Sequence, residues 1–498
     1  MKNRWKNQVF AVCLAGALAA ASLSACGSTS TTATTENTVS VEETTAEKEV
    51  ENTTRTYLTK EDITVNETYE STNDSEHAIE VDGEEATYAN IGVTKTGDSD
   101  QGDEADFYGD NSAIFSTNGA TTTITDSLIE TDGTHANAVF SYGEGTVVTI
   151  ANSVIETNGN CSGGLMTTGG GTMNAENLTI LTSGNSSAAI RSDRGGGTVN
   201  VTEGYYKTSG TGSPVIYSTA DITVSDAYLE STASQAVVVE GQNSVTLNNC
   251  EVVGDNNTKN SDHSETYQAV MIYQSMSGDA DDGTAAFSMT GGSLENMNGD
   301  VFFVTNTQAT ITLDGVAIAN NDTDGVFLRA EAAGWGSEGS NGGQLNLTAK
   351  NQTIAGNILV DEVSKLNLYL TDNSSYSGAI NPDGAAGEVY VELSDGTTWT
   401  LTEDSYITAL TCDAGSIQLN GHTLYVNGVA YTEGSASEGS AVEFSQSSGG
   451  GMGDGMPGGE MPSGEMPSGE KPSGEKPSGA MQNAPGGDGS EPPAKPGE

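Results

Sequence analysis

Basic residues are scarce in this sequence of 498 residues: Lys and Arg number 17, against 69 Asp and Glu, for a formal net charge of −52. A field of that sign repels nucleic acid and anionic membrane surfaces, and this excludes both as electrostatic partners. Only 17% of the residues are charged, and the Glu/Lys/Ala/Leu runs typical of helical proteins are missing after the N-terminus. Thr, Ser, Asn and Gly favour strands and tight turns instead. The composition therefore predicts an all-β chain.

Cysteine is also scarce, with five in the chain, and no CxxC motif or Cys/His spacing indicates a zinc site. Cys161, Cys250 and Cys412 lie far apart, and an odd number does not fit a disulfide framework. We therefore expect these three to be small buried side chains.

Long apolar runs are absent except near the N-terminus. Basic residues at positions 2, 4 and 6 precede a short apolar stretch from Val9 to Ala21, which is too short to span a bilayer comfortably. The sequence LSAC, ending at Cys26, then resembles a bacterial lipobox, in which the cysteine receives the lipid. Residues 1–26 are thus predicted to be a lipoprotein signal peptide, with an ordinary signal peptide and a chance cysteine as the alternative. Acyl chains on Cys26 would be the only membrane anchor, on the extracellular face of the cell membrane.

Two flanking segments have little apolar content. Residues 27–72 are rich in Thr, Ser and Glu and are expected to form a disordered tether. Residues 434–498 consist largely of Gly, Pro, Met, Ser and Glu, contain repeats such as MPSGE, and are expected to form a disordered tail. The folded domain is therefore predicted to span residues 73–433.

Within this domain the sequence repeats itself with a period of 23 to 26 residues. One aliphatic or aromatic ladder holds Ile129, Ile155, Ile180, Tyr206, Leu229 and Val252. A second holds Ile114, Val139, Leu165, Ile190, Ile216 and Val238. A third holds Asp126, Asn152, Asn177, Glu203, Asp226 and Asn249, and a fourth holds Thr131, Thr157, Thr182, Thr208 and Ser231. Such self-similarity indicates a repeat architecture.

The period distinguishes between architectures. A propeller blade needs about 40 residues, and a sandwich has no reason to stack identical side chains at a fixed period. In a parallel solenoid each residue pairs with its counterpart one coil away, so like stacks on like. We therefore predict a right-handed parallel β-helix. Residues 255–268, 274–284 and 330–343 are expected to be inserted loops, and the stretch from Ser416 is expected to cap the interior.

A row of larger side chains follows the second ladder. Because neighbours along a strand point to opposite faces, this row should face outward if the ladder faces inward. Exposed rings one coil apart match the repeat of a sugar chain, and sugar faces stack on flat rings. The alternative is a reversed register with these rings in the core. The row holds Phe115, Phe140, Met166, Arg191, Tyr217 and Val239, with Tyr273 one coil further on.

The SDRGGG motif adds Asp193 and Arg194 beside Arg191. Two of the few arginines in one coil suit contact with an acidic sugar. The alternative is an Asp/Arg pair that holds a turn. The predicted carbohydrate-binding residues are therefore Phe115, Phe140, Arg191, Asp193, Arg194, Tyr217 and Tyr273.

An acidic segment precedes the first regular coil. Carboxylates at alternate positions suit a hard cation such as Ca²⁺, although no EF-hand pattern is present, and solvated acidic loops are the common alternative. The predicted calcium ligands are Asp98, Asp100, Asp103, Asp106 and Asp110.

Several motifs together resemble one family. AIRSDRGGGTVNV, SPVIYSTADITV, VVVEGQNSVTLNN and DVFFVTNTQATITL look like the lyase-like carbohydrate-binding domains that bind cellulose and polygalacturonate, and like related adhesin-like bacterial surface lipoproteins. The resemblance covers about residues 78–430. It implies a pectate-lyase-type β-helix, calcium sites, and binding of an acidic or plant-cell-wall glycan without cleavage.

Three functions remain open at this point. The first is a monomeric surface module that binds polysaccharide. The second is a calcium-dependent polysaccharide lyase, for which an arginine base would be needed. No complete catalytic constellation is present, so fold analogy alone supports an enzyme. The third is a structural adhesin with protein partners.

Overall fold

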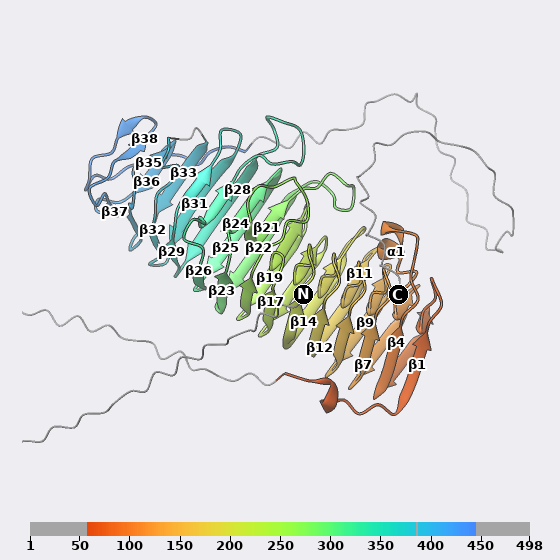
Figure 1. Ribbon diagram of the computed structural model, residues 1–498. Helices are drawn as coiled ribbons and strands as arrows, with labels where there is room; N and C mark the ends of the chain where they lie inside the picture. Colours follow the sequence, from red (N-terminus) through yellow and green to blue (C-terminus); the bar gives the residue numbers. More distant parts are fainter. Residues whose placement is uncertain (1–56, 385–386, 445–498) are drawn as a thin grey trace, which may run out of the picture. The chain divides into compact units, whose positions relative to one another are not determined.

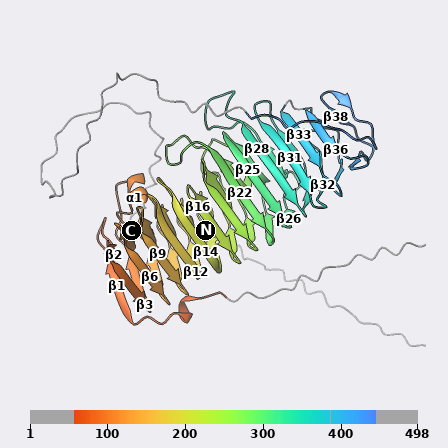
Figure 2. The ribbon, with the colours of Figure 1, turned by 180° about the vertical axis from the view of Figure 1, so that it is seen from behind.

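The computed structural model describes residues 57–384 and 387–444, and their regular secondary structure is nearly all β-strand. The predicted signal peptide with Cys26, residues 27–56 of the predicted tether and residues 445–498 of the predicted tail lie outside the described residues. Figures 1 and 2 show strands stacked one above another from β1 to β38, following the order of the sequence.

Each turn of chain contributes one strand to each of three rows, and nearly all pairing is parallel. One row is an 11-stranded sheet, and the other two merge into a 21-stranded sheet because β12 and β14 run through both. The 11-stranded sheet holds β2 (Ile79–Asp82), β5 (Ile114–Thr117), β8 (Val139–Tyr142), β11 (Leu165–Thr168), β13 (Ile190–Ser192), β15 (Ile216–Ser218), β18 (Val237–Glu240), β21 (Gln268–Tyr273), β24 (Asp300–Thr305), β27 (Leu328–Ala330) and β30 (Ile358–Val360).

The 21-stranded sheet contains the other two rows. Its first row holds β3 (Glu85–Ala89), β6 (Thr121–Thr125), β9 (Val147–Ala151), β16 (Asp221–Ser225), β19 (Ser244–Asn248), β22 (Thr284–Thr290), β25 (Thr307–Asp314), β28 (Gly343–Lys350), β31 (Lys365–Thr371), β33 (Glu388–Leu393) and β36 (Ala409–Cys412). Its second row holds β1 (Glu67–Ser71), β4 (Ile91–Lys95), β7 (Leu128–Thr131), β10 (Val154–Thr157), β17 (Tyr228–Ser231), β20 (Glu251–Gly254), β23 (Ser293–Asn296) and β26 (Ala317–Asn320). The strands that span both rows are β12 (Gly171–Thr182) and β14 (Gly197–Thr208).

The stack ends in shorter strands. A four-stranded sheet of β29 (Thr353–Ala355), β32 (Ser375–Ser377), β34 (Thr398–Thr400) and β37 (Ile417–Gln418) follows the second row. The last sheet holds β35 (Ser405–Ile407), β38 (Leu424–Val426) and β39 (Val429–Ala430). Pairing of β38 with β39 is antiparallel, so the last turn of chain departs from the parallel pattern.

The repeat ladders predicted from the sequence are register partners. Ile129 pairs with Ile155, and Ile155 pairs with Ile180. Both ladders of large apolar residues, apart from Val238, lie in one continuous buried core between the sheets. One register is corrected: Ile216 pairs with Val237 rather than with Val238. Seven residues lie between Thr208 and Ile216 but only five between Ser231 and Val237, so the turn is shorter there.

The third ladder occupies the bend between the two rows of the 21-stranded sheet. Asn152 and Asn177 have φ angles of 48° and 50°, and the equivalent residues from Asp126 to Asn249 also have positive φ. Asn and Asp tolerate this left-handed conformation better than other side chains with a Cβ atom. The Asn177 amide also donates to Oδ1 of Asn152 across 2.9 Å, so the ladder is hydrogen-bonded along the stack.

Both predicted domain boundaries are corrected. The short 3₁₀ helix η1 (Lys60–Asp62) and β1 belong to the fold, and the Tyr57 ring stacks on that of Tyr205 at 4.2 Å. At the other end, Ser437 pairs with Cys412, and the Val442 amide donates to Asn367. The ordered part therefore begins before residue 73 and continues past residue 433, because polar segments at both ends pair with exposed strands. In the described part of the chain, no helix has the length and apolar character needed to cross a membrane.

Candidate functional site

Four insertions extend from the 11-stranded sheet on its outer side. Residues 255–267, 274–283 and 331–342 lie between strands, as predicted for the three inserted loops. The fourth, residues 96–113, carries the helix α1 (Asp103–Tyr108), which the sequence had indicated as a calcium loop. Thr168 in β11 donates to the carbonyl of Phe107 across 2.7 Å and so holds α1 against the sheet.

The row of large side chains faces away from the central core, but its predicted exposure is wrong. Phe115, Phe140 and Met166 form a separate buried cluster, and Phe140 is 0% exposed. Further along, Val238 rather than Val239 continues the row. The cause is α1 and its flanking residues, which fold back over these rings; a Cβ on Gly109 would lie 2.7 Å from the Phe115 ring. Direct sugar stacking on Phe115 or Phe140 is excluded in this arrangement.

Within the described residues, the five predicted calcium ligands do not form a cluster. Asp98 accepts a hydrogen bond from the Thr134 amide, and Asp110 accepts one from the Ser99 hydroxyl. Asp100 and Asp103 are exposed, whereas Asp106 is buried. Only Asp103 and Asp106 lie in α1, and they are separated because Asp106 is buried whereas Asp103 stays exposed.

The Asp106 carboxylate instead belongs to a buried ion-pair network. Its Oδ2 lies 3.2 Å from the Arg191 guanidinium, and its Oδ1 accepts a 3.0 Å hydrogen bond from the Asn137 amide. Arg191 also donates to Asp193 across 2.7 Å. The guanidinium lowers the pKa of the Asp106 carboxyl, although burial acts in the opposite direction. The structure therefore contains a structural Asp/Arg pair, which was the alternative interpretation. It joins Arg191 to both Asp193 and Asp106.

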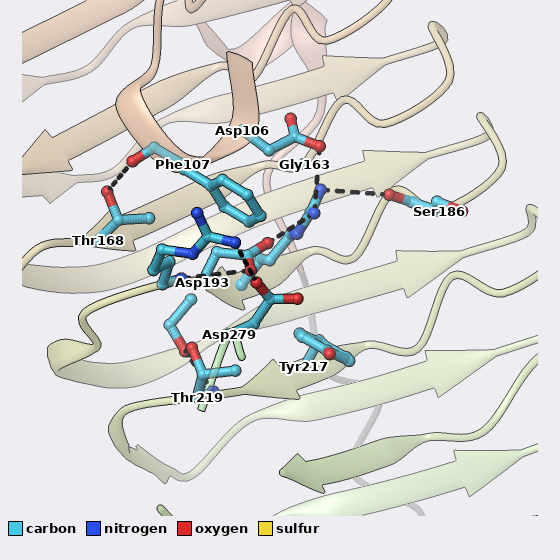
Figure 3. A network of polar contacts seen from close by, with 12 residues as sticks. Asp106, Phe107, Gly163, Thr168, Ser186, Asp193, Tyr217, Thr219 and Asp279 are labelled. Carbon is cyan, nitrogen blue, oxygen red and sulfur yellow. Dashed lines mark hydrogen bonds and ion pairs between the residues drawn. The ribbon is translucent and has the colours of Figure 1, made fainter. Parts of the chain in front are cut away.

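Asp193 and Arg194 continue this network toward the loop 274–283. Burial raises the pKa of Asp193 to about 6, and nearby Asp106 and Asp279 add to the effect. Arg194 pairs with Asp279 at 3.0 Å, and its guanidinium lies 3.9 Å from the centroid of the Phe107 ring. Figure 3 shows Phe107, Asp193, Asp279 and Tyr217 gathered on the outer side of the sheet.

Tyrosines line the next coils. The hydroxyl of Tyr217 donates to the buried carboxylate of Glu240 and lies 3.4 Å from the hydroxyl of Tyr273. Tyr273 pairs with Glu240 in register, two residues beyond the row in which it was predicted. The Trp335 ring meets the Tyr273 ring edge-on at 5.2 Å. Burial raises the pKa of both tyrosines, so their hydroxyls remain neutral donors at ordinary pH.

Two adjoining cavities form one cleft over this surface. One has a volume of about 260 Å³ and reaches from Asp103 in α1 to Asp279. The other has a volume of about 130 Å³ and reaches Trp335. They share the residues Gly212, Pro214, Tyr217, Asn260 and Tyr273. We call these two cavities the outer cleft.

Four of the seven predicted carbohydrate-binding residues line the outer cleft. These are Arg191, Asp193, Tyr217 and Tyr273. Arg194 contacts two residues of its wall, whereas Phe115 and Phe140 lie beneath α1. Sequence reasoning did not assign Asp279, Asn260 or Trp335 to glycan binding, because they lie in insertions outside the period.

A second group lies at the edge of the same network. Ligand atoms of Asp106, His135 and Cys161 all lie within 4.8 Å of one another. His135 and Cys161 have φ angles of 56° and 55° and occupy equivalent positions in successive turns of chain. A separation equal to the repeat period is the signal that could have joined them.

An analogous pair occurs further along the stack. Arg329 follows Phe303 in the same row as Arg191 and donates to Asp300 across 2.6 Å. Arginines at this row are thus held by buried aspartates in both places, so neither guanidinium is a free ligand group.

Comparisons with protein-family models, with curated proteins and with solved structures give no match to this chain.

Proposed function

We propose that the chain binds a linear, mainly neutral polysaccharide along the outer cleft and does not cleave it. The observation that carries this proposal is the combination, in one cleft, of partly exposed aromatic rings with carboxylate and amide groups, to which all four insertions contribute residues. Sugar faces pack on aromatic rings, and sugar hydroxyls hydrogen-bond to polar side chains.

The direction of the cleft supports a polymeric ligand. Its lining residues come from successive coils, from Ser186 through Tyr217 to Tyr273, and then from the insertion with Trp335. Parallel strands are spaced by about 4.8 Å, which is close to the length of one sugar unit. A chain of a few sugars laid along the stack could contact equivalent positions on successive coils.

The charges of the cleft favour a neutral glycan over a polyuronate. Asp103, Asp193 and Asp279 line it, while Arg191 is already paired with two carboxylates. Arg194 is likewise held by Asp279. A uronate would therefore meet an excess of carboxylates and no free guanidinium among these residues, and the whole chain carries −52. The sequence-based expectation of an acidic glycan loses its main physical support.

The state of Arg191 supports binding without cleavage. A lyase base must give up its proton before it can accept one from the sugar. The two carboxylates beside Arg191 raise its pKa further above its already high value, so it keeps its proton. The lyase alternative would require another base.

We also infer the finer architecture and location. Connections between parallel strands are nearly always right-handed, which makes a right-handed, pectate-lyase-like β-helix the form that fits the stacked parallel sheets. With a lipid on Cys26, a monomeric chain would present the outer cleft at the cell surface. In the alternative of a structural adhesin, the stack of strands alone would serve the function, and the outer cleft would have no role.

The test is retention of the full-length chain on insoluble cellulose and its retardation in native gels that contain soluble neutral β-glucans or polygalacturonate. We expect retention by a neutral glycan, at least tenfold weaker binding after Tyr273→Ala or Trp335→Ala, and no release of sugar products. The polygalacturonate gels are repeated with added calcium and with a chelator, so that any cation-dependent binding of the polyuronate is detected.

Tyr406→Ala is the matched control, because Tyr406 stacks on Tyr425 at 4.8 Å near the far end of the fold, and neither tyrosine lines the outer cleft. Equal loss of binding in Tyr406→Ala and Tyr273→Ala would contradict the assignment to the cleft. Unsaturated products from polygalacturonate would establish the lyase instead. No retention by any glycan tested would leave the adhesin as the better proposal.

A further inference from the structure

The cluster of Asp106, His135 and Cys161 joins three parts of the fold. Asp106 lies in α1, while His135 and Cys161 lie in the turns that follow β7 and β10. Both turn residues adopt the left-handed conformation, which directs their side chains to the same side of the stack. Their ligand atoms and the Asp106 carboxylate lie within 4.8 Å of one another.

His135 provides an independent indication of a ligand at this cluster. It is only 7% exposed, and its Nδ1 atom is buried and makes no hydrogen bond to any described residue. The same atom lies 3.2 Å from Oδ2 of Asp106. The lone pair of a neutral imidazole is repelled by a carboxylate oxygen at that distance. A proton on Nδ1, in the neutral δ tautomer or in the imidazolium, removes this repulsion, and so does a metal ion between the two atoms.

A protonated His135 and a bound metal ion would each balance the local charges. Asp106 and Asp193 contribute two negative charges and Arg191 one positive charge, which leaves one negative charge in a buried network. A protonated His135 cancels it. A divalent ion with the Cys161 thiolate cancels it equally, because the ion adds two positive charges and the thiolate one negative charge.

The ligand types favour a borderline soft ion. Imidazole, thiolate and carboxylate are ligands of Zn²⁺, and three protein ligands leave a fourth tetrahedral position for water. Calcium takes six or more oxygen ligands, which this set cannot supply. The Asn137 amide holds the other Asp106 oxygen at 3.0 Å and so orients the carboxylate as an outer hydrogen-bond partner would.

We propose that Asp106, His135 and Cys161 form a binding site for Zn²⁺ or a similar divalent transition metal, which fastens α1 to two successive coils of the stack. Arg191 stays paired with Asp193 at 2.7 Å, and it also contacts Oδ2 of Asp106, the proposed ligand atom, at 3.2 Å. This site is distinct from the calcium loop expected from the sequence, of which only Asp106 takes part. The proposal does not depend on the polysaccharide proposal.

Cobalt substitution tests the site directly. We expect the full-length reduced chain to bind one equivalent of Co²⁺ with a thiolate-to-cobalt charge-transfer band and visible bands of tetrahedral intensity. Zn²⁺ should displace the cobalt and raise the melting temperature of the chain by several degrees. Cys161→Ser should abolish the charge-transfer band, and His135→Gln should weaken cobalt binding at least tenfold.

His422→Gln is the matched control, because His422 lies near the C-terminal end of the fold, away from the cluster. Circular dichroism checks that each variant keeps the strand content of the parent, and Cys161→Ala repeats the thiol deletion with a smaller side chain. Absence of the charge-transfer band in the folded parent, or its persistence in both Cys161 variants, would overturn the proposal. An unshifted melting temperature with Zn²⁺ would do the same.

Discussion

Arg191 and Asp106 meet at 3.2 Å although 85 residues separate them along the chain. One comes from a strand of the 11-stranded sheet and the other from the helix that covers it. The side chains are 14% and 2% exposed, respectively, so the pair is largely shielded from water. This contact, with Asp193 as the second acceptor, joins the outer cleft to the body of the stack.

Removal of Arg191 is predicted to destabilise the fold strongly. Arg191→Gln leaves Asp106 and Asp193 buried without their shared cation, and breaking a buried pair in this way costs about 3–5 kcal/mol. Urea unfolding followed by fluorescence measures the loss. Arg194→Gln serves as the control, because that side chain is 41% exposed and its ion pair should contribute no more than about 1 kcal/mol. Equal losses for both variants would show that burial of the network is not what matters.

His135 is predicted to make stability fall as the pH rises. The close contact with the Asp106 carboxylate raises the pKa of His135 above the ordinary value of 6.5, although burial and Arg191 act against this. A group with a raised pKa in the folded state stabilises the fold below pH 6.5, and this contribution is lost as the pH rises through the folded-state pKa. Asp103 and Cys161 are the other ionisable groups nearby.

The measurement is the free energy of unfolding between pH 5.5 and pH 8.5 with a chelator present, so that no metal replaces the proton. The parent chain should lose stability across this range, and His135→Gln should lose less. Asp193, with a pKa raised to about 6, titrates in both proteins and cancels in the difference. Parallel curves for the two proteins would contradict the assignment of the effect to His135.

A glycine stands two residues after each threonine of the fourth ladder, and we predict that it cannot be replaced without loss of stability. A Cβ on Gly159 would lie 1.9 Å from the carbonyl oxygen of Gly133 one coil away, which forces the coils apart. Gly159→Ala should therefore cost several kcal/mol, as other overpacking substitutions do at their upper end. Thermal unfolding checks this. At Gly143 a Cβ meets nothing within 4 Å and only the positive φ is unfavourable, so Gly143→Ala should cost about 1 kcal/mol.

The stack could be predicted from the sequence because residues that pair in a parallel repeat are separated by one repeat period along the chain. Ile129, Ile155 and Ile180 pair in register at the separations read from the sequence. The error at Val238 arose where the turn after Ser231 is shorter, since the ladder can be counted only while turn lengths stay constant.

The covering of the outer face could not be predicted in the same way. Alternation along β8 placed Phe140 on the outer side, but only the path of residues 96–113 buries it. That insertion has no counterpart in other coils, so its position cannot be inferred from the repeat spacing. For the same reason the cleft residue Trp335 was missed, while Tyr217, which belongs to a regular strand, was identified.

The left-handed ladder allows a prediction that separates backbone from side-chain effects. Asn152 has a φ of 48° and accepts a hydrogen bond of 2.9 Å from Asn177. Asn152→Gly keeps the conformation and loses the bond, whereas Asn152→Ala loses the bond and strains the backbone by about 1 kcal/mol more. Urea unfolding should therefore rank the parent above Asn152→Gly and Asn152→Gly above Asn152→Ala. A glycine variant less stable than the alanine variant would mean that flexibility in the unfolded chain outweighs the strain at this bend, and that asparagine is selected there for its hydrogen bond alone.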